Sequence, residues 1–375
     1  MKTKAALLKS AGGDWEIEQI DLGDPAAGEV RVRLSASGLC HSDHHLRTGD
    51  QSPALFPVLG GHEGAGVVIE TGAGVSDLAE GDHVVLSFIP ACGTCHMCAR
   101  GLQNLCDLGA EAMTGRAISD GGFRASWQGK PVMPMCGLGA FSPYVTIHHS
   151  AAVKIDKDVP LNRAALLGCA VSTGWGSAVS IGGTRPGDTV VVVGIGGVGS
   201  NAVQGAAIAG ARYVVAVDPV EFKRHKAIEF GATHTFSTLA EAGEAVSAMT
   251  WGRLADCTII TTAEIEGALI DAALAVTGKG GQVVVTALGK TADRHVQMSL
   301  FELTVLQKRV QGAMFGGIGP REQIPHLLEL YRLRQLKLDE LVTRTYRLEE
   351  INEGYEDMLA GRNIRGLIEY TPDDY

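Results

Sequence analysis

Four of the chain's eight cysteines fall within fifteen residues, where their thiols could meet around one ion. Cys92, Cys95, Cys98 and Cys106 follow the spacing C-x2-C-x2-C-x7-C. Cysteines three residues apart bridge one another poorly but converge easily on a metal, and four thiolates complete the coordination of Zn²⁺. We therefore predict a structural zinc site rather than disulfides. The alternative is an iron–sulfur cluster, although its bacterial signature has a shorter last gap and a proline where this chain has Asp107.

A second candidate metal site draws on three residues that lie far apart in the sequence. Cys40 lies in GLCHSDHH, His62 in GGHEGAG and Cys169 in LGCAVSTGWG. Each has a simpler explanation on its own, because a lone cysteine is often a small buried apolar residue and a histidine between glycines can be a turn residue. Together they supply two thiolates and one imidazole, the ligand set of a catalytic zinc that keeps a fourth position for a substrate oxygen.

A glycine-rich turn predicts a dinucleotide site. The motif GIGGVG, from Gly194 to Gly199, directly follows the β-branched run Thr189–Val193 and precedes a helical pattern over residues 198–209. In this context Gly194 permits a sharp turn, Gly196 lets the backbone approach a pyrophosphate, and Gly199 lets the helix pack closely. The helix N-terminus then faces the phosphates.

Asp218 is expected to discriminate between the two nicotinamide dinucleotides. It stands 19 residues after Gly199, at the end of the predicted strand Tyr213–Val217. A carboxylate there bonds the ribose hydroxyls and repels a 2′-phosphate, so the sequence favours NAD over NADP. The alternative is a helix N-cap, because Glu221 follows three residues later as in a capping box.

Two kinds of pattern along the chain predict two domains that position these residues. The first ~150 residues carry short β-branched runs separated by Gly, Asp and Pro, which indicates an irregular β-rich domain. From about Gly187, strand-like runs alternate with helix-length segments, which is typical of βαβ units around a parallel sheet. The predicted strands are Val30–Leu34, Gly66–Glu70, His83–Ser87, Ala151–Ile155, Thr189–Val193, Tyr213–Val217, Cys257–Thr261 and Gln282–Ala287. The predicted helices are Phe222–Phe230, Glu264–Val276 and Glu322–Leu336, followed by a strand–helix–strand tail that ends near Tyr370.

Charge and hydrophobicity exclude several classes of function. The 375 residues include 32 Lys and Arg against 42 Asp and Glu, a formal net charge of −10, and no basic cluster suited to a phosphate backbone stands out. The uncharged stretch Thr189–Ala211 is long enough to cross a bilayer, but it reads better as strand, glycine turn and buried helix. Ala5–Leu8 is shorter than the apolar core of a signal peptide. We therefore expect a cytoplasmic chain that begins with a strand and has no nucleic-acid or membrane partner.

These motifs together resemble the zinc-dependent medium-chain alcohol dehydrogenases over essentially the whole chain. The matching features are GLCHSD, GHEGAG with Gly81-Asp82-His83-Val84, the four-cysteine lobe, the Cys169 motif, GIGGVG and Arg365. The resemblance implies an α/β fold, with a Rossmann-type doubly wound parallel sheet domain over residues 171–318. A β-rich GroES-like catalytic domain would comprise residues 1–170 and 319–375. It also implies two zinc ions per subunit, one catalytic on Cys40, His62 and Cys169 and one structural in the lobe 92–106.

The family pattern carries over to further catalytic positions. It implies that Ser42 bonds the substrate oxygen and that His45 is the distal proton acceptor, reached through the cofactor ribose. Asp43 matches the carboxylate that orients the ligating His62. Glu63 matches an acidic neighbour behind the metal.

The pattern also implies which residues hold the cofactor and the substrate. Lys223 and Arg365 match the adenosine-ribose and pyrophosphate contacts, and Phe88 matches a wall of the substrate pocket. The remaining cofactor positions are Thr173, Gly194, Gly196, Gly197, Val198, Gly199 and Asp218. A solvated charge is the alternative for Lys223, and simple core packing is the alternative for Phe88 and Val198. His41 departs from the many relatives that carry a basic pyrophosphate contact, so attraction there is expected to be weaker and pH-dependent.

The resemblance implies reversible transfer of hydride between a primary or secondary alcohol and NAD, in a homodimer or homotetramer that pairs through Leu300–Gly317. The strings CHSDHHLRTGD and GGHEGAG are most similar to actinobacterial members, which include enzymes that recycle bound NAD with a nitroso dye. Thiol-adduct formaldehyde dehydrogenases are also among them and give an alternative function. A non-catalytic NAD-sensing zinc protein is the alternative from a different class. Zinc-free quinone and enoyl reductases share the fold but lack equivalents of Cys40, His62 and Cys169.

Overall fold

The computed structural model describes residues 1–375, which form two compact units. The first unit contains Met1–Cys169, Gly319–Leu333 and Leu338–Tyr375, and the second contains Ala170–Ile318 and Arg334–Lys337. Residues 334–337 join the second unit because the Gln204 side chain pairs with both backbone groups of Lys337. The Lys337 N–H donates to Gln204 Oε1 at 2.8 Å, and Gln204 Nε2 donates to the Lys337 carbonyl at 3.2 Å.

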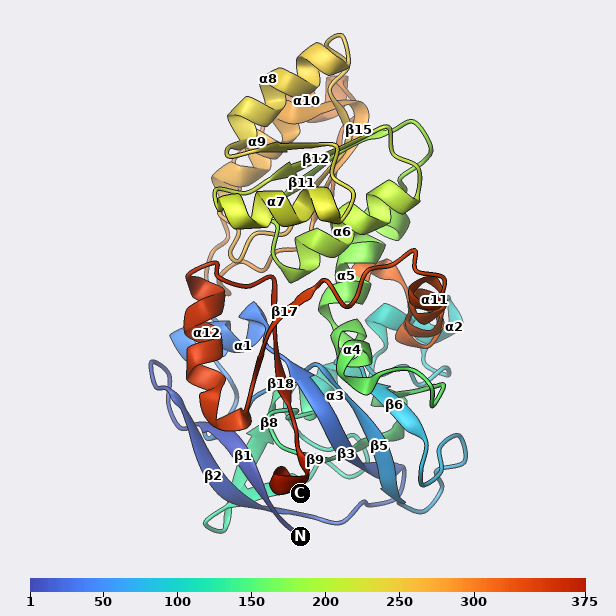
Figure 1. The fold of residues 1–375 in the computed structure, drawn as a ribbon, viewed down its shortest axis with the longest axis vertical. Helices are drawn as coiled ribbons and strands as arrows, with labels where there is room; N and C mark the ends of the chain where they lie inside the picture. The colour runs from blue at the N-terminus through green and yellow to red at the C-terminus, as the bar shows by residue number, and fades with distance from the viewer. The chain divides into compact units, whose positions relative to one another are not determined.

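Two β-sheets form most of the first unit (Figure 1). A closed barrel has the order β1-β2-β7-β8-β4, and a seven-stranded sheet has the order β10-β6-β5-β3-β18-β17, with β9 paired to β3. The barrel strands are β1 (Lys2–Leu8), β2 (Trp15–Leu22), β4 (Val58–Leu59), β7 (Ala125–Trp127) and β8 (Lys130–Pro134). The larger sheet contains β3 (Glu29–Gly38), β5 (Gly64–Thr71), β6 (His83–Leu86), β9 (Tyr144–His148), β10 (Ala152–Ile155), β17 (Val342–Tyr346) and β18 (Arg365–Glu369).

The helices of the first unit are mostly short. They are α1 (His41–Thr48), α2 (His96–Ala99), α3 (Gly109–Met113), α4 (Leu161–Ala164), α11 (Pro320–Arg332) and α12 (Ile351–Leu359). One large apolar cluster joins the sheets to α1 and α12, and its fully buried members include Leu7, Leu34, Phe141 and Tyr355. The predicted strands of this part are confirmed as β3, β5, β6 and β10, and the predicted tail is confirmed as β17, α12 and β18.

The second unit is a six-stranded parallel sheet with the order β13-β12-β11-β14-β15-β16. This is the doubly wound order, in which the chain reverses direction at its first strand. The strands are β11 (Thr189–Val193), β12 (Tyr213–Val217), β13 (His234–Phe236), β14 (Ala255–Ile260), β15 (Thr277–Val285) and β16 (Arg309–Gly312). The helices are α5 (Ala170–Gly176), α6 (Gly197–Ile208), α7 (Glu221–Glu229), α8 (Leu239–Met249), α9 (Gly267–Val276) and α10 (Leu300–Val305).

The sequence patterns predicted this sheet well because its strands are buried on both faces. β11 and β12 match the predicted residues, and every residue of β11 is buried. The stretch Thr189–Ala211 is confirmed as strand, glycine turn and the buried helix α6. No single helix in the structure is long and apolar enough to cross a membrane, whereas one bent pair, Leu161–Gly168 with Ala170–Ile181, passes that test by length and composition.

Candidate active site and metal centres

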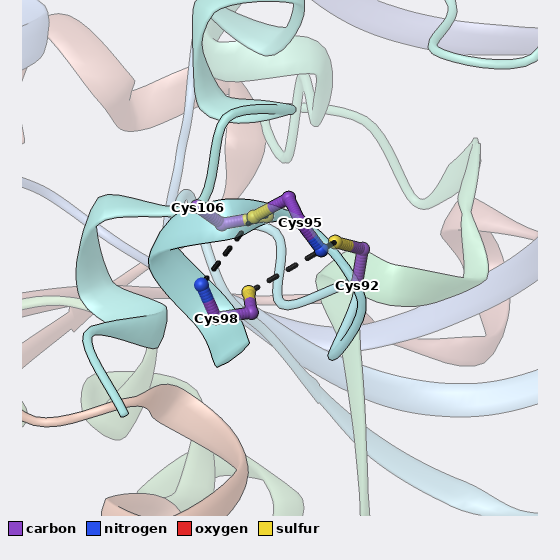
Figure 2. Close-up of side chains that lie close together, drawn as sticks. All are labelled: Cys92, Cys95, Cys98 and Cys106. Carbon is purple, nitrogen blue, oxygen red and sulfur yellow. Dashed lines mark hydrogen bonds between the residues drawn. The ribbon is translucent and has the colours of Figure 1, made fainter. Parts of the chain in front are cut away.

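The four-cysteine lobe brings its sulfur atoms together, as Figure 2 shows. All four lie within 4.8 Å of one another. Cys92 Sγ is 3.9 Å from Cys98 Sγ, and Cys95 Sγ is 3.9 Å from Cys106 Sγ. A tetrahedral zinc with Zn–S bonds of about 2.3 Å separates its sulfurs by about 3.8 Å, so the donor set fits zinc. All four thiols are free in the structure and lie where one ion could bind them together.

Backbone N–H groups donate to some of these sulfurs, and the pKa values of Cys92 and Cys106 differ. Cys95 N–H donates to Cys92 Sγ at 3.3 Å, and Asp107 N–H donates to Cys95 Sγ at 3.4 Å. Burial opposes ionisation of Cys92, but the N–H groups of Thr94 and Cys95 lower its pKa to about 6. Burial raises the pKa of Cys106 to about 12. The lobe therefore reaches its fully ionised form only when a bound cation displaces the remaining protons.

The three separate ligand candidates of the second site converge at one end of β3 and β5, two central strands of the larger sheet in the first unit. Cys40 is the residue before α1, at the end of β3, and His62 lies two residues before β5. Cys169 follows a short 3-10 helix, Ala165–Gly168. One ligand atom from each of these residues, together with a Glu63 oxygen, lies within 4.8 Å of the others, and all four residues are buried.

A carboxylate fixes the orientation of the His62 ring. Asp43 is fully buried, and its Oδ1 accepts the Gly61 N–H at 2.7 Å while its Oδ2 lies 3.0 Å from His62 Nδ1. With Asp43 on the Nδ1 side of the ring, Nε2 is the nitrogen that would offer its lone pair to a metal. Both buried ring nitrogens lack a hydrogen bond of full geometry in the protein, so Nε2, on the side away from Asp43, is available as a metal ligand.

The pKa values of the two cysteines of this site shift in opposite directions. Their mutual hydrogen bond lowers the pKa of Cys40 well below its ordinary value and raises the pKa of Cys169 well above it. Burial opposes ionisation of Cys40 and adds to the rise at Cys169. Because zinc binds thiolates, occupation of this site must also release a proton. Both donor sets thus fit a divalent cation that competes with protons.

Glu63 and Arg365 form a buried ion pair beside these ligands. Arg365 Nη2 donates to Glu63 Oε2, and the two side chains are 5% and 0% exposed. Burial raises the pKa of Glu63 to about 7, although Arg365 opposes the rise. A Cβ atom at Gly38 would lie 2.2 Å from Glu63 Oε2, so only glycine leaves room for the pair. Sequence reasoning gave these two residues separate roles and missed their contact.

The remaining residues predicted in the first unit lie around the same site. Ser42 Oγ is 3.8 Å from Cys40 Sγ. The Phe88 ring meets His62 edge-on, with centroids 5.7 Å apart. His45 is buried on α1, and His41 is half-buried on the same helix.

The glycine turn of the second unit is shaped by close backbone contacts. Gly194 has φ = +92°, which glycine adopts without strain. A Cβ at Gly199 would lie 1.9 Å from the Gly194 carbonyl oxygen, so helix α6 can pack this closely only without a side chain there. A Cβ at Gly196 would meet nothing within 4 Å, which leaves its backbone open to a ligand.

Asp218 is bound to the glycine turn and does not cap a helix. Its Oδ2 accepts the Ile195 N–H at 2.7 Å, and its Oδ1 accepts the Val220 N–H at 2.9 Å. The residue that precedes α7 is Val220, and no side chain caps that helix. The N-cap alternative for Asp218 is therefore wrong.

Other residues predicted near a nucleotide also belong to the second unit. Thr173 is buried on α5, and its Oγ1 has no hydrogen-bond partner. Val198 and Lys223 are half-buried on α6 and α7. Arg224 was missed by sequence reasoning, although its Nη1 donates to the carbonyls of Asp218 and Pro219 at 2.8 Å each. Its place in the first turn of α7, six residues after Asp218, was the available signal.

Comparison with known proteins places these features in a wider context. Residues 26–157 match the family described as "Alcohol dehydrogenase GroES-like domain", and residues 197–332 match "Zinc-binding dehydrogenase". The chain is 52% identical over 374 residues to alcohol dehydrogenase B of Mycobacterium tuberculosis, with 100% of both chains covered. It is 51% identical over 373 residues to the NDMA-dependent alcohol dehydrogenase of Amycolatopsis methanolica, again with 100% of both covered.

Two solved structures share the whole fold. One is an alcohol dehydrogenase zinc-binding domain protein from Burkholderia ambifaria, with a TM-score of 0.92, 31% identity and 99% of each chain covered. The other is benzyl alcohol dehydrogenase from Acinetobacter calcoaceticus, with a TM-score of 0.90, 27% identity and 99% and 100% of the two chains covered.

Proposed function

Because this chain belongs to the zinc-binding alcohol dehydrogenase family, we propose that it transfers hydride reversibly between a primary or secondary alcohol and NAD. The observation that carries the proposal is the convergence of Cys40, His62 and Cys169 around one point, with the Ser42 hydroxyl beside them. This set supplies three protein ligands and a neighbouring proton acceptor. A purely structural zinc site would have four ligands and no such acceptor.

Each unit offers residues that fit an implied group. Cys40, His62 and Cys169 would hold the catalytic zinc, and the four-cysteine lobe would hold a structural one. The open backbone at Gly196 and the unpartnered Thr173 Oγ1 suit the pyrophosphate and nicotinamide parts of NAD. When bound, zinc supplies a Lewis acid that lowers the pKa of an alcohol, and NAD supplies the hydride acceptor.

The protein's own residues orient the reactants and move the proton. Asp43 holds the His62 ring so that Nε2 faces the two sulfurs. Ser42 Oγ takes the proton that leaves the alcohol, and His45 receives it farther from the site. Arg365 competes for the Glu63 carboxylate, which would otherwise add a fourth protein donor and exclude substrate oxygen. The edge of Phe88 limits the space next to His62.

The experiment that tests the proposal is turnover of an alcohol panel by zinc-replete and zinc-depleted protein, with NAD as acceptor. The panel should include short, aromatic and terpenoid alcohols and a formaldehyde–thiol mixture, since a thiol-adduct formaldehyde dehydrogenase is the second candidate. NDMA should be tried as an acceptor because one relative of the chain is dependent on it. Zinc-dependent oxidation of any alcohol supports the proposal, whereas NAD binding without turnover would indicate a nucleotide-sensing protein.

The Asp218→Asn variant is expected to lose preference for NAD. Asparagine can still accept a backbone N–H from Ile195 or Val220 but no longer carries the charge that opposes a 2′-phosphate. We expect the ratio of kcat/KM for NAD to that for NADP to fall by about tenfold, equivalent to ~1.4 kcal/mol.

Asp188→Asn is the matched control for this prediction. Asp188 precedes β11 at its other end, where it accepts the Arg185 N–H at 2.7 Å, so the same charge change should leave cofactor choice unaltered. Equal selectivity in both variants would show that Asp218 only braces the glycine turn.

Self-association is the remaining part of the proposal. In the second unit, α10 exposes Leu300, Phe301 and Val305, which are 71%, 75% and 61% exposed. The neighbouring β16 is the last strand of its sheet. Apolar side chains this exposed next to an open strand edge favour pairing with another chain.

We expect Phe301→Glu to shift the protein from an oligomer toward a monomer in sedimentation velocity experiments. A carboxylate in an apolar interface would lose its hydration without gaining a partner. Trp251→Glu is the control, because Trp251 is 76% exposed and lies outside α10 and β16. An unchanged sedimentation coefficient for Phe301→Glu would place the contact elsewhere.

A further inference from the structure

The end of helix α1 folds a carboxylate back against His45. Gly49 ends the helix with φ = +82°, and the Gln51 N–H then donates to the His45 carbonyl at 3.2 Å. This turn brings Asp50 Oδ2 to 3.4 Å from His45 Nδ1. The Thr48 hydroxyl donates to the same carboxylate oxygen at 2.6 Å and so fixes its position.

The pair spans the boundary between the buried site and solvent. The His45 side chain is 8% exposed, whereas that of Asp50 is 21% exposed. His44 and Arg47 on this helix also lie near the pair. Arg47 is bound to Asp14 and to the Gly13 carbonyl, so Asp50 is not needed as its counter-ion.

We propose that Asp50 is a positioning residue for the reaction, and that it fixes the tautomer of His45 and carries its proton to water. This inference rests on the proposed relay role of His45. A carboxylate at Nδ1 favours the Nδ1–H tautomer, so Nε2 holds the lone pair that accepts the incoming proton.

The proton balance of the step is simple. One proton arrives at Nε2 and gives an imidazolium, which the Asp50 carboxylate stabilises. The proton on Nδ1 then passes to Asp50 Oδ2 and on to water, which leaves a neutral ring with its proton on Nε2. Before the next turnover Nε2 releases that proton to solvent and Nδ1 regains one through Asp50, which restores the Nδ1–H tautomer. No electrons move in these steps, and the hydride leaves separately with the alcohol carbon.

The test compares Asp50→Ala with Asp14→Ala in the zinc-loaded protein. Both variants remove a carboxylate that binds a residue of α1, but only Asp50 contacts His45. For Asp50→Ala we expect kcat for alcohol oxidation to fall by roughly 10- to 100-fold, as for other residues that orient a catalytic imidazole. The KM values for alcohol and NAD should change little, and small buffer bases should restore part of the rate.

A second measurement does not depend on turnover. Nitrogen-15 NMR of zinc-loaded protein should report the Nδ1–H tautomer of His45 in the unchanged chain and in Asp14→Ala, and a mixture in Asp50→Ala. Asp50→Glu should recover the tautomer in part. If Asp50→Ala leaves both kcat and the tautomer unchanged, the assignment to Asp50 is wrong.

The His45→Gln variant separates this inference from the function on which it rests. If His45→Gln slows turnover by about 10²-fold or more but Asp50→Ala does not, His45 acts in the relay without Asp50. If His45→Gln is as active as the unchanged protein, the relay itself is wrong and the role of Asp50 is overturned with it.

Discussion

The Cys169→Ser variant is expected to fold normally, to contain one zinc ion per chain in place of two, and to lose nearly all turnover. Serine places a protonated hydroxyl where zinc prefers a thiolate, and the buried Cys40 and His62 cannot hold the ion alone. The catalytic ion contributes several kcal/mol of charge stabilisation, so its loss should reduce kcat by roughly 10³-fold or more.

The measurement pairs kcat for the best alcohol with elemental analysis of zinc. Cys136→Ser is the matched control, because Cys136 is also buried in the first unit but belongs to neither metal cluster. That variant should keep two zinc ions and most of its activity. A Cys169→Ser protein that retains both ions, or that turns over alcohol with only one, would remove Cys169 from the catalytic site.

The Cys95→Ser variant should lose thermal stability but keep the catalytic site. Cys95 Sγ accepts the N–H groups of Cys98 and Asp107 and lies against Cys106 Sγ, so its removal opens the whole lobe. The free energy of metal binding at such a site contributes to the free energy of folding. A loss of several kcal/mol from this source would lower Tm by on the order of 10 °C. We expect one zinc ion per chain and faster proteolysis within residues 92–113, measured beside Cys136→Ser.

The unchanged protein offers an independent check on the same lobe. A chelator should first remove the ion of the three-ligand site, because that site leaves a coordination position open. Activity would then disappear while Tm and the lobe's ion remain. Simultaneous loss of both ions, or iron with visible absorbance in place of zinc, would contradict the assignment of the lobe.

Local pattern explains why much of the fold could be predicted. Thr189–Val193 is a continuous β-branched run and Tyr213–Val217 contains no charged residue, and the two match β11 and β12. Parallel strands that are buried on both faces form such continuous hydrophobic runs, so their ends are easy to predict. The helix predicted to reach Leu336 instead ends at Arg332, because Arg334 takes φ = +56° and turns the chain back toward Gln204. The helical sequence pattern of residues 322–336 does not predict that turn.

Contacts between distant residues could not be read from the sequence. Glu63 and Arg365 are separated by 302 positions, and their pairing depends on the register of β18 against β3. The segment after Cys106 forms α3, β7 and β8, and the two strands are part of the closed barrel. The sequence of this segment has no regular hydrophobic pattern from which these elements could be predicted. Asp50 was also missed, because its contact with His45 depends on the left-handed turn at Gly49.

The pairing of β18 with β3 also determines when the larger sheet can be completed during synthesis of the chain. Residues 367–369 complete a sheet that begins at residues 36–38, and the whole second unit is synthesised between them. While the chain is still emerging from the ribosome, β3 exposes part of its edge and Glu63 lacks the cation that it meets in the finished fold. A chain released before Arg365 would therefore carry an open strand and an unneutralised carboxylate, both of which favour aggregation or degradation. Only a chain synthesised beyond residue 369 can therefore complete this sheet and pair Glu63 with Arg365.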